Sequence, residues 1–129
     1  MRDFQSLCQI RRSYRKYTNQ PVEQEKLDYI IRCALMSPAG KRMNPWHFVV
    51  IKNEEILRQL AGCRTYGSGM FDTAMAGIVV AADTSVIDTW QCDAAIAAQN
   101  IWLAAADQGL GAWWCQVYQR EGAEDWERK

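Results

Sequence analysis

The sequence predicts an α+β or α/β fold in which helices pack on a small β-sheet. Two observations carry this prediction. Apolar residues follow a helical or a strand-like spacing in the order helix, helix, strand, helix, strand, long helix, strand. No repeat, low-complexity stretch or linker divides the 129 residues, so we expect a single domain over residues 1–129. Three strands make a thin sheet, which further strands from a partner chain or from residues outside this sequence would complete.

Four helices are predicted from apolar side chains that recur three and four positions apart. They are expected over residues 3–12, 23–36, 54–61 and 88–108. Asp3 and Asn53 are the expected N-caps, and Gly109 is the expected residue just after the last helix. The side chains expected to face inward are Leu27, Ile30, Ile31, Ala34, Leu35, Ile56, Leu57 and Leu60.

The last of these helices is rich in alanine, and its small residues lie on several faces. This pattern predicts close packing on more than one side, in a core or at a subunit interface. The helix also carries Gln99 and Asn100. An unpaired buried amide costs about 1–3 kcal/mol, so hydrogen bonds across a helix interface or to backbone are favoured over a ligand-binding role.

Three strands are predicted over residues 46–51, 77–82 and 110–118. The first two are apolar and rich in β-branched residues, which predicts buried strands and not a solvated edge. The third is aromatic and contains glycine. Its Gly109-Leu110-Gly111 start does not make a dinucleotide-binding fingerprint, because no GxGxxG follows a strand.

The composition is that of a soluble globular chain, with 49% hydrophobic and 23% charged residues. Fifteen basic and fifteen acidic residues give no net charge, which argues against a general nucleic-acid binder. His47 is the only histidine, so a multi-histidine zinc site is excluded, and we expect no metal site. His47 begins a strand beside Trp46, and no catalytic role is assigned to it.

The five cysteines, at positions 8, 33, 63, 92 and 115, form no CxxC pair. We interpret them as reduced thiols, mostly buried, in a cytoplasmic protein. The N-terminus has no apolar signal-peptide segment, and the most apolar stretch, 94–106, is too short to span a bilayer. No membrane association is therefore expected.

Two segments could bind a ligand. Arg11, Arg12, Ser13 and Arg15 offer guanidinium forks and a hydroxyl that suit a phosphate, although a solvated helix end is the favoured interpretation of this run alone. The loop 37–45, with its Pro and Gly residues and Asn44, could approach a flat heteroaromatic ring, although an ordinary helix-to-strand connection is favoured on its own.

Taken together, the motifs resemble the nitroreductase family of FMN-dependent oxidoreductases, particularly its short members. The matching stretches occur in the family's order and span nearly the whole chain. They are residues 11–17 (RRSYRKY), 21–22 (PV), 37–40 (SPAG), 44–48 (NPWHF), 77–80 (GIVV), 93–100 (DAAIAAQN) and 109–112 (GLGA).

The resemblance implies an α+β fold with helices around a small central sheet, and an intertwined homodimer with FMN at the interface. It implies a ping-pong reaction in which hydride passes from NAD(P)H through flavin N5 to a small electron acceptor, such as a nitroaromatic or a quinone. The flavin carries the chemistry, so no catalytic side chain is expected. The residues that match cofactor-binding positions are Arg11, Arg12, Ser13, Arg15, Pro38, Ala39, Gly40, Asn44, Gln116 and Val117. Of these, the loop 38–40 is implied to pack on the ring from the other subunit.

The sequence departs from the family at its C-terminal end. Family members continue past the region of residues 126–129 with a last strand and commonly a late basic residue, and neither is present here. The chain is therefore either a shortened natural protein or a truncated one. This departure motivates an alternative function, that of a non-catalytic paralogue that dimerises and binds flavin weakly or not at all. Nucleic-acid binding through residues 11–16 is a weaker alternative, because the chain is neutral overall.

Overall fold

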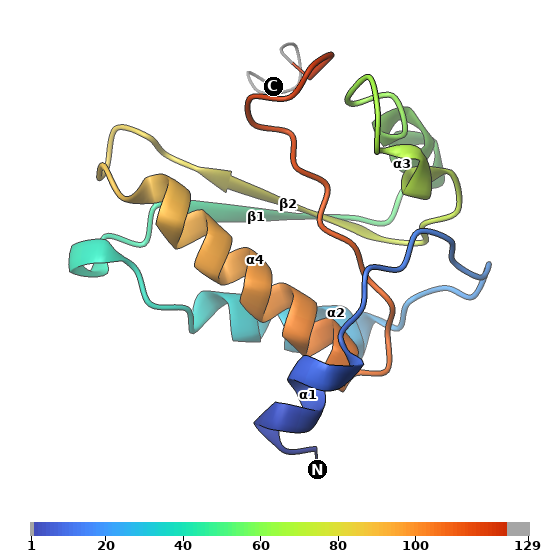
Figure 1. Cartoon of the computed structure of the whole chain (residues 1–129), viewed down its shortest axis with the longest axis horizontal. Coiled ribbons are helices and arrows are strands. Elements are labelled where there is room, and N and C mark those ends of the chain that lie inside the picture. Colours follow the sequence, from blue (N-terminus) through green and yellow to red (C-terminus); the bar gives the residue numbers. More distant parts are fainter. Residues whose placement is uncertain (1, 124–129) are drawn as a thin grey trace.

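The computed structural model describes residues 2–123 as helices packed against one small sheet (Figure 1). In chain order the elements are α1 (Phe4–Ile10), α2 (Gln24–Leu35), a 3₁₀ turn (Gly40–Arg42), β1 (Trp46–Ile51), α3 (Glu54–Leu60), a second 3₁₀ turn (Gly69–Asp72), β2 (Gly77–Ala82) and α4 (Trp90–Asp107). All four predicted helices are therefore present, each within a few residues of its expected bounds. The stretch from residue 126, on which the predicted shortening rests, lies outside the described residues.

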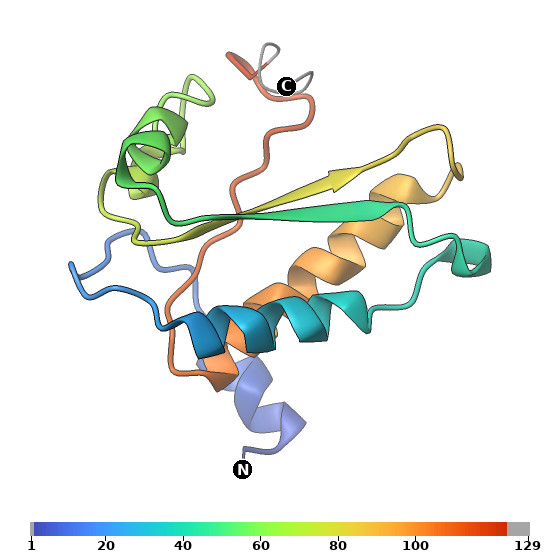
Figure 2. The same ribbon diagram turned by 180° about the vertical axis from the view of Figure 1, so that it is seen from behind.

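The sheet consists of β1 and β2, which run antiparallel with Trp46 opposite Ala82 and Ile51 opposite Gly77. Helices α2 and α4 lie together on one side of it, as Figures 1 and 2 show from opposite directions. The prediction that both strands are buried is wrong. Val49 and Val79, which face each other in the register, are 53% and 39% exposed. Within the described chain the helices cover one face of the sheet, so side chains on the other face of both strands are exposed, and in β1 the exposure extends to Val50.

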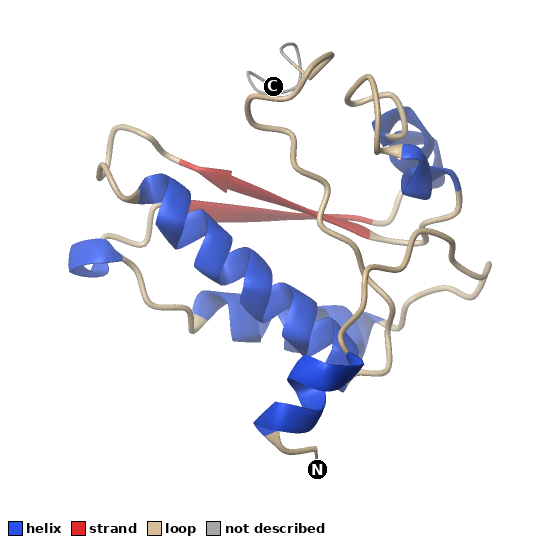
Figure 3. Ribbon diagram, viewed as in Figure 1, coloured by secondary structure: helices blue, strands red, loops and turns tan. Residues whose placement is uncertain are grey.

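The third predicted strand, over residues 110–118, is not a strand. This segment is extended, but it pairs through a single parallel bridge between Ser13 and Ala112, with the Tyr14 amide donating to the Ala112 carbonyl at 3.1 Å. The reason is its direction: the segment crosses β1 and β2 and does not run alongside either (Figure 3). A chain that crosses β1 and β2 cannot build a hydrogen-bonded ladder with them, and its one bridge is made to the segment 11–16 instead.

Two clusters of buried side chains form the core. In the first, Ile30 of α2 packs against Ala104 and Ala105 of α4, whose small side chains let the two helices approach closely. In the second, Leu57 and Leu60 of α3 pack with Cys63, against which Cys115 and Val117 of the crossing segment lie. The crossing segment therefore ties α3 to the rest of the molecule through side chains.

The predicted helix caps are confirmed. Asp3 and Asn53 accept hydrogen bonds from the amides of Ser6 and Ile56 at 2.8 and 3.0 Å. Gly109 adopts a φ of +74° after α4, and the Leu110 amide returns to the Ala105 carbonyl at 2.9 Å. This is the Schellman arrangement, which needs a left-handed residue at that position.

Several predictions about burial are wrong. Leu35 and Ile56 are 56% and 44% exposed, because each lies at the edge of an apolar stripe whose centre, Ala34 or Leu57, makes the packing contact. Ile31 is only half-buried. Cys8 and Cys92 are exposed, although most cysteines were expected inside; all five are free thiols. In residues 2–123, no helix combines the length and the apolar character that a membrane crossing needs.

Candidate functional site

The basic segment 11–16 leaves α1 and lies against the C-terminal half of α4 and the start of the crossing segment. The guanidinium carbon of Arg11 lies 4.3 Å from the centre of the Trp102 ring, and that of Arg15 lies 5.9 Å from the centre of the Trp113 ring. Stacking on an aromatic face orients a guanidinium group while leaving its N–H edge open. The indole N–H of Trp102 also donates to the Arg12 carbonyl at 3.4 Å.

The charges of this segment are exposed and are not neutralised by neighbouring carboxylates. Arg12, Ser13 and Arg15 are all exposed. Arg12 donates to the carbonyls of Gln9, in the last turn of α1, and of Arg11, in its own segment. The two ion pairs within residues 2–123 involve Lys26 and Arg58, so no carboxylate there pairs with these arginines. The donor set is therefore one that suits an anion with several oxygens, such as a phosphate.

The loop 37–40 follows α2 and lies along α4 between Asp93 and Asn100. The Gly40 amide donates to Asp93 Oδ1 at 3.1 Å, and Ser37 Oγ accepts from the Asn100 side chain at 2.8 Å. The second bond gives Asn100 a hydrogen-bond partner within the protein, as expected, but the partner is a side chain of the loop after α2 and not the backbone or a facing helix. Gln99, in contrast, is exposed.

The chain then turns tightly into β1. Lys41, Arg42 and Asn44 all have positive φ values, of 50°, 57° and 47°. Such values are uncommon for residues other than glycine and favour asparagine among them. The Asn44 side chain is exposed, whereas Pro45 and Trp46 are buried.

Within the described residues no hydrogen bond or ring contact joins the predicted arginines to the loop 38–40, although the start of the loop, Ser37, bonds to Asn100, two residues before Trp102. Arg11 contacts α4 at Trp102, whereas Gly40 contacts it at Asp93. At 1.5 Å per residue, these two contact points are separated by about 14 Å along the helix. Each group is thus ordered separately against the same helix.

The remaining predicted residues, Gln116 and Val117, lie in the crossing segment. The Gln116 carbonyl accepts from Arg64 at 2.9 Å, and its side-chain oxygen accepts from the indole N–H of Trp114 at 3.0 Å. Val117 packs on the Leu57 cluster. These contacts hold the backbone of the segment in one extended course without a sheet ladder.

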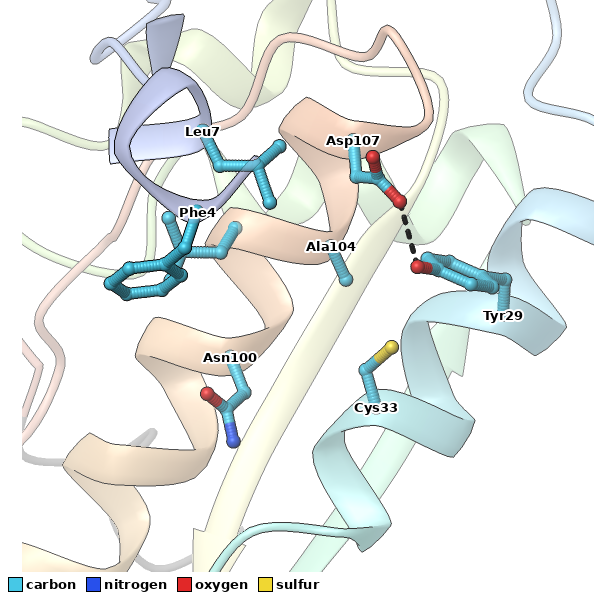
Figure 4. A pocket seen from close by; sticks show the side chains of 8 residues that line it. Phe4, Leu7, Tyr29, Cys33, Asn100, Ala104 and Asp107 are labelled. Atoms are coloured by element: carbon cyan, nitrogen blue, oxygen red, sulfur yellow. Dashed lines mark hydrogen bonds between the residues drawn. The ribbon is translucent and has the colours of Figure 1, made fainter. Parts of the chain in front are cut away.

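A shallow pocket of about 200 Å³ lies between α1, α2 and α4 (Figure 4). The Tyr29 hydroxyl donates to Asp107 Oδ2 at 2.7 Å, and this bond, together with burial, raises the pKa of the phenol to about 12. Phe4 and Leu7 form the apolar wall on the α1 side. Sequence reasoning did not predict this pocket, and none of the predicted site residues lines it.

A second hollow, of about 380 Å³, lies between residues 17–19 and the turn after the second 3₁₀ helix. The Tyr17 amide donates to the Thr73 hydroxyl at 3.1 Å. Burial raises the pKa of the Tyr17 phenol to about 12. His47, on β1, is exposed.

Comparison with known proteins supports the resemblance. The Nitroreductase family model matches residues 9–63. A "Putative NADH dehydrogenase/NAD(P)H nitroreductase" of Archaeoglobus fulgidus is 34% identical over 125 residues, which cover 94% of this chain and 71% of the relative. The chain belongs to the nitroreductase family.

Solved structures agree with this assignment. An FMN-dependent nitroreductase from Clostridium difficile superposes with a TM-score of 0.89 at 41% identity, over 92% of this chain and 69% of its own. A structure from Desulfovibrio desulfuricans, titled a putative nitroreductase in complex with FMN, superposes with a TM-score of 0.80 at 28% identity, over 89% and 70%. The chain therefore has the nitroreductase fold, as the resemblance implied.

Sequence reasoning missed the aromatic and acidic partners of the nitroreductase motifs. Trp102 and Trp113 stack with the arginines, and Asp93 holds Gly40. A signal was present for Asp93 alone, since a carboxylate inside an alanine-rich helix needs a partner in the same way as the amides beside it. Nothing in the sequence indicates which arginine each tryptophan faces.

Proposed function

We propose that the protein is an FMN-dependent NAD(P)H oxidoreductase that reduces a small acceptor, such as a nitroaromatic or a quinone, by a ping-pong mechanism. Membership of the nitroreductase family supports an oxidoreductase, and the neighbouring structures include one described as FMN-dependent and one in complex with FMN. The observation that carries the proposal is the arginine segment: guanidinium groups are stacked on tryptophans with no carboxylate partner in residues 2–123.

The donors of this segment fit the phosphate of FMN. Arg11, Arg12 and Arg15 together supply more N–H groups than their own backbone contacts use, and the Ser13 hydroxyl lies between them in sequence. Guanidinium forks bind phosphate oxygens in pairs. In the proposed function, this segment neutralises the anionic end of the cofactor and fixes its orientation.

The ring would lie against the loop 38–40 of a second copy. Pro38, Ala39 and Gly40 present backbone with little side-chain bulk, and Asn44 offers an exposed amide beside them. Along α4 the Gly40 contact at Asp93 lies about 14 Å from the Arg11 contact at Trp102. The resemblance to the family assigns the loop and the arginines to different subunits. We therefore propose a homodimer, which is the form in which both groups could contact one cofactor.

The backbone near Gln116 and Val117 is proposed to meet flavin N5, and the contacts of Gln116 with Arg64 and of Val117 with the Leu57 cluster support that role by fixing its place. When bound, FMN supplies the hydride chemistry, accepting hydride from NAD(P)H and passing it to the acceptor. The chain's own residues bind the phosphate, orient the ring and hold an amide at its edge. None of them needs to act as a nucleophile, and His47 has no role in this scheme. The absence of disulfides among the five cysteines supports a cytoplasmic location.

The test is the double variant Arg12→Ala/Arg15→Ala. We expect wild-type protein to bind FMN near one per chain and to oxidise NADH or NADPH with an acceptor, and the variant to lose the flavin. The control is Arg32→Ala/Arg120→Ala, which removes the same charge from exposed positions elsewhere. This control variant should retain the flavin. A variant with a full flavin content would refute the phosphate assignment. A wild-type dimer that stays colourless and inactive after FMN addition would favour the non-catalytic alternative.

A further inference from the structure

Helix α4 presents two polar side chains that both reach the loop 37–40. Asp93 and Asn100 are seven residues apart, which is nearly two helical turns, so they lie on the same face of the helix. Each bonds to a different end of the loop: Asp93 to Gly40 and Asn100 to Ser37. The loop is therefore attached to the helix at its first and last residues.

The Asp93 attachment is buried. The residue is 3% exposed, and no cation pairs with it in the described residues. Its two oxygens accept from the Gly40 amide and from the Thr89 hydroxyl, each at 3.1 Å. A carboxylate removed from water without a cation is costly, and two hydrogen bonds offset part of that cost. A Cβ on Gly40 would overlap the Thr89 hydroxyl, so the contact also requires glycine.

The Asn100 attachment is also inside the molecule. Ser37 is 6% exposed, and its hydroxyl accepts from Asn100 Nδ2 at 2.8 Å. The Ser37 amide closes the end of α2 by donating to the Ala34 carbonyl at 3.1 Å. This residue therefore joins the end of α2, the loop and α4.

The distance along α4 between Asp93 and Asn100 matches the length of the loop that they hold. Seven residues of helix rise about 10.5 Å. Three extended residue steps, from Ser37 to Gly40, span at most about 10–11 Å. The loop is extended at Ala39, which has φ −139° and ψ 151°. A segment held at both ends at nearly full extension has little freedom to move.

We propose that Asp93 and Asn100 are positioning residues for the flavin, which hold the loop 37–40 extended so that its backbone can lie against the ring. This inference rests on the proposed function. Both side chains act through the loop, and neither is assigned a contact with the cofactor. Because they order the loop before FMN binds, less conformational entropy is lost on binding, and we expect both side chains to raise the affinity for FMN.

A purely structural role predicts a different result, and α4 offers a matched control. The Tyr29–Asp107 bond also joins α2 to α4, but at the other end of α4 (Figure 4). Tyr29→Phe removes that bond and leaves the loop attachments in place. If hydrogen bonds between these helices matter only for stability, Tyr29→Phe and the loop variants will have similar effects on every measurement.

The experiment measures the FMN dissociation constant, by quenching of flavin fluorescence, and the melting temperature of each apo-protein. We expect Asp93→Ala and Asn100→Ala each to weaken FMN binding at least tenfold, which corresponds to 1.4 kcal/mol. Asp93→Asn keeps an oxygen for the Gly40 amide and should bind within threefold of wild type. Tyr29→Phe should lower the melting temperature comparably without a loss of affinity.

Hydrogen exchange of the Gly40 amide in the apo-protein gives a readout that does not depend on flavin. It should accelerate in Asp93→Ala and not in Tyr29→Phe. If Asp93→Ala does not fold, Ser37→Ala removes the other attachment from the loop side and should lose affinity in the same way. Equal FMN affinity in wild type and the loop variants would overturn the positioning role alone. Absence of FMN binding by wild type would overturn the proposed function and this inference together.

Discussion

Gly111→Ala tests whether the crossing segment supports the arginine segment. An added Cβ at position 111 would lie 2.9 Å from Tyr14 Cγ and 3.1 Å from Tyr14 Cβ. Carbon atoms in favourable contact are about 3.5–4.0 Å apart, so the overlap is about half an ångström or more. The atoms concerned are next to the Tyr14 backbone, so rotation of the ring cannot relieve the overlap fully. The backbone around Ser13 and Tyr14 must move instead.

The expected cost follows from two opposing terms. Overpacking of this kind costs about 1–3 kcal/mol. Replacing glycine by alanine restricts the unfolded chain and returns about 0.4–1 kcal/mol, because Gly111 does not have a positive φ. The net loss in the free energy of unfolding therefore lies between about 0 and 2.6 kcal/mol, with the middle of the two ranges giving about 1.3 kcal/mol. The same shift strains the hydrogen bond between the Tyr14 amide and the Ala112 carbonyl, so we expect FMN affinity to fall at least threefold.

Urea unfolding followed by tryptophan fluorescence gives the stability, and a fluorescence titration gives the FMN affinity. The control is Gly69→Ala, because a Cβ there would meet nothing within 4 Å. This control should be neutral or slightly stabilising, with unchanged affinity. If Gly111→Ala unfolds at the same urea concentration as wild type and binds FMN equally well, the contact with Tyr14 does not position the basic segment.

Three further predictions concern the core and the titratable groups. Leu57→Ala removes a side chain that is 1% exposed and should cost about 2–5 kcal/mol in urea unfolding. Exposed Cys8 and Cys92 should react rapidly with a thiol reagent at pH 8, whereas Cys115 should react slowly, because burial and then its neighbouring cysteine raise its pKa to about 12. The raised pKa of Tyr29 means that its hydrogen bond stabilises the fold fully below pH 10 and is lost as the pH rises towards 12. The stability difference between wild type and Tyr29→Phe should therefore shrink between pH 10 and 12.

The helices were predictable because their signals are local. Asp3, Asn53 and Gly109 act within one turn of their own helix, and the apolar spacing of α2 identifies Leu27, Ile30 and Ala34. The segment 110–118 was mistaken for a strand because its composition suits extended backbone, which it adopts. Whether an extended segment pairs depends on its direction relative to the sheet, and composition does not encode that direction.

Local motifs also singled out the candidate site residues. Motifs indicate which residues carry donors, so the arginines and the loop 38–40 could be singled out, although their contact with FMN remains a proposal. The partners that hold them come from α4 and from the crossing segment, far away in sequence. Trp102 and Asp93 lie on one helix within a few turns of each other, yet they serve different segments.

The candidate site depends on small residues as much as on charged ones. Gly40 lets the loop approach Thr89, Gly111 lets the basic segment approach its neighbour, and Ala104 lets α2 approach α4. At each point the geometry is set by the absence of a side chain. An exposed arginine can lose its charge without moving the backbone, whereas an added methyl group at these positions must displace it. Substitutions at the small residues should therefore impair both stability and flavin binding, while substitutions of the arginines should impair binding alone.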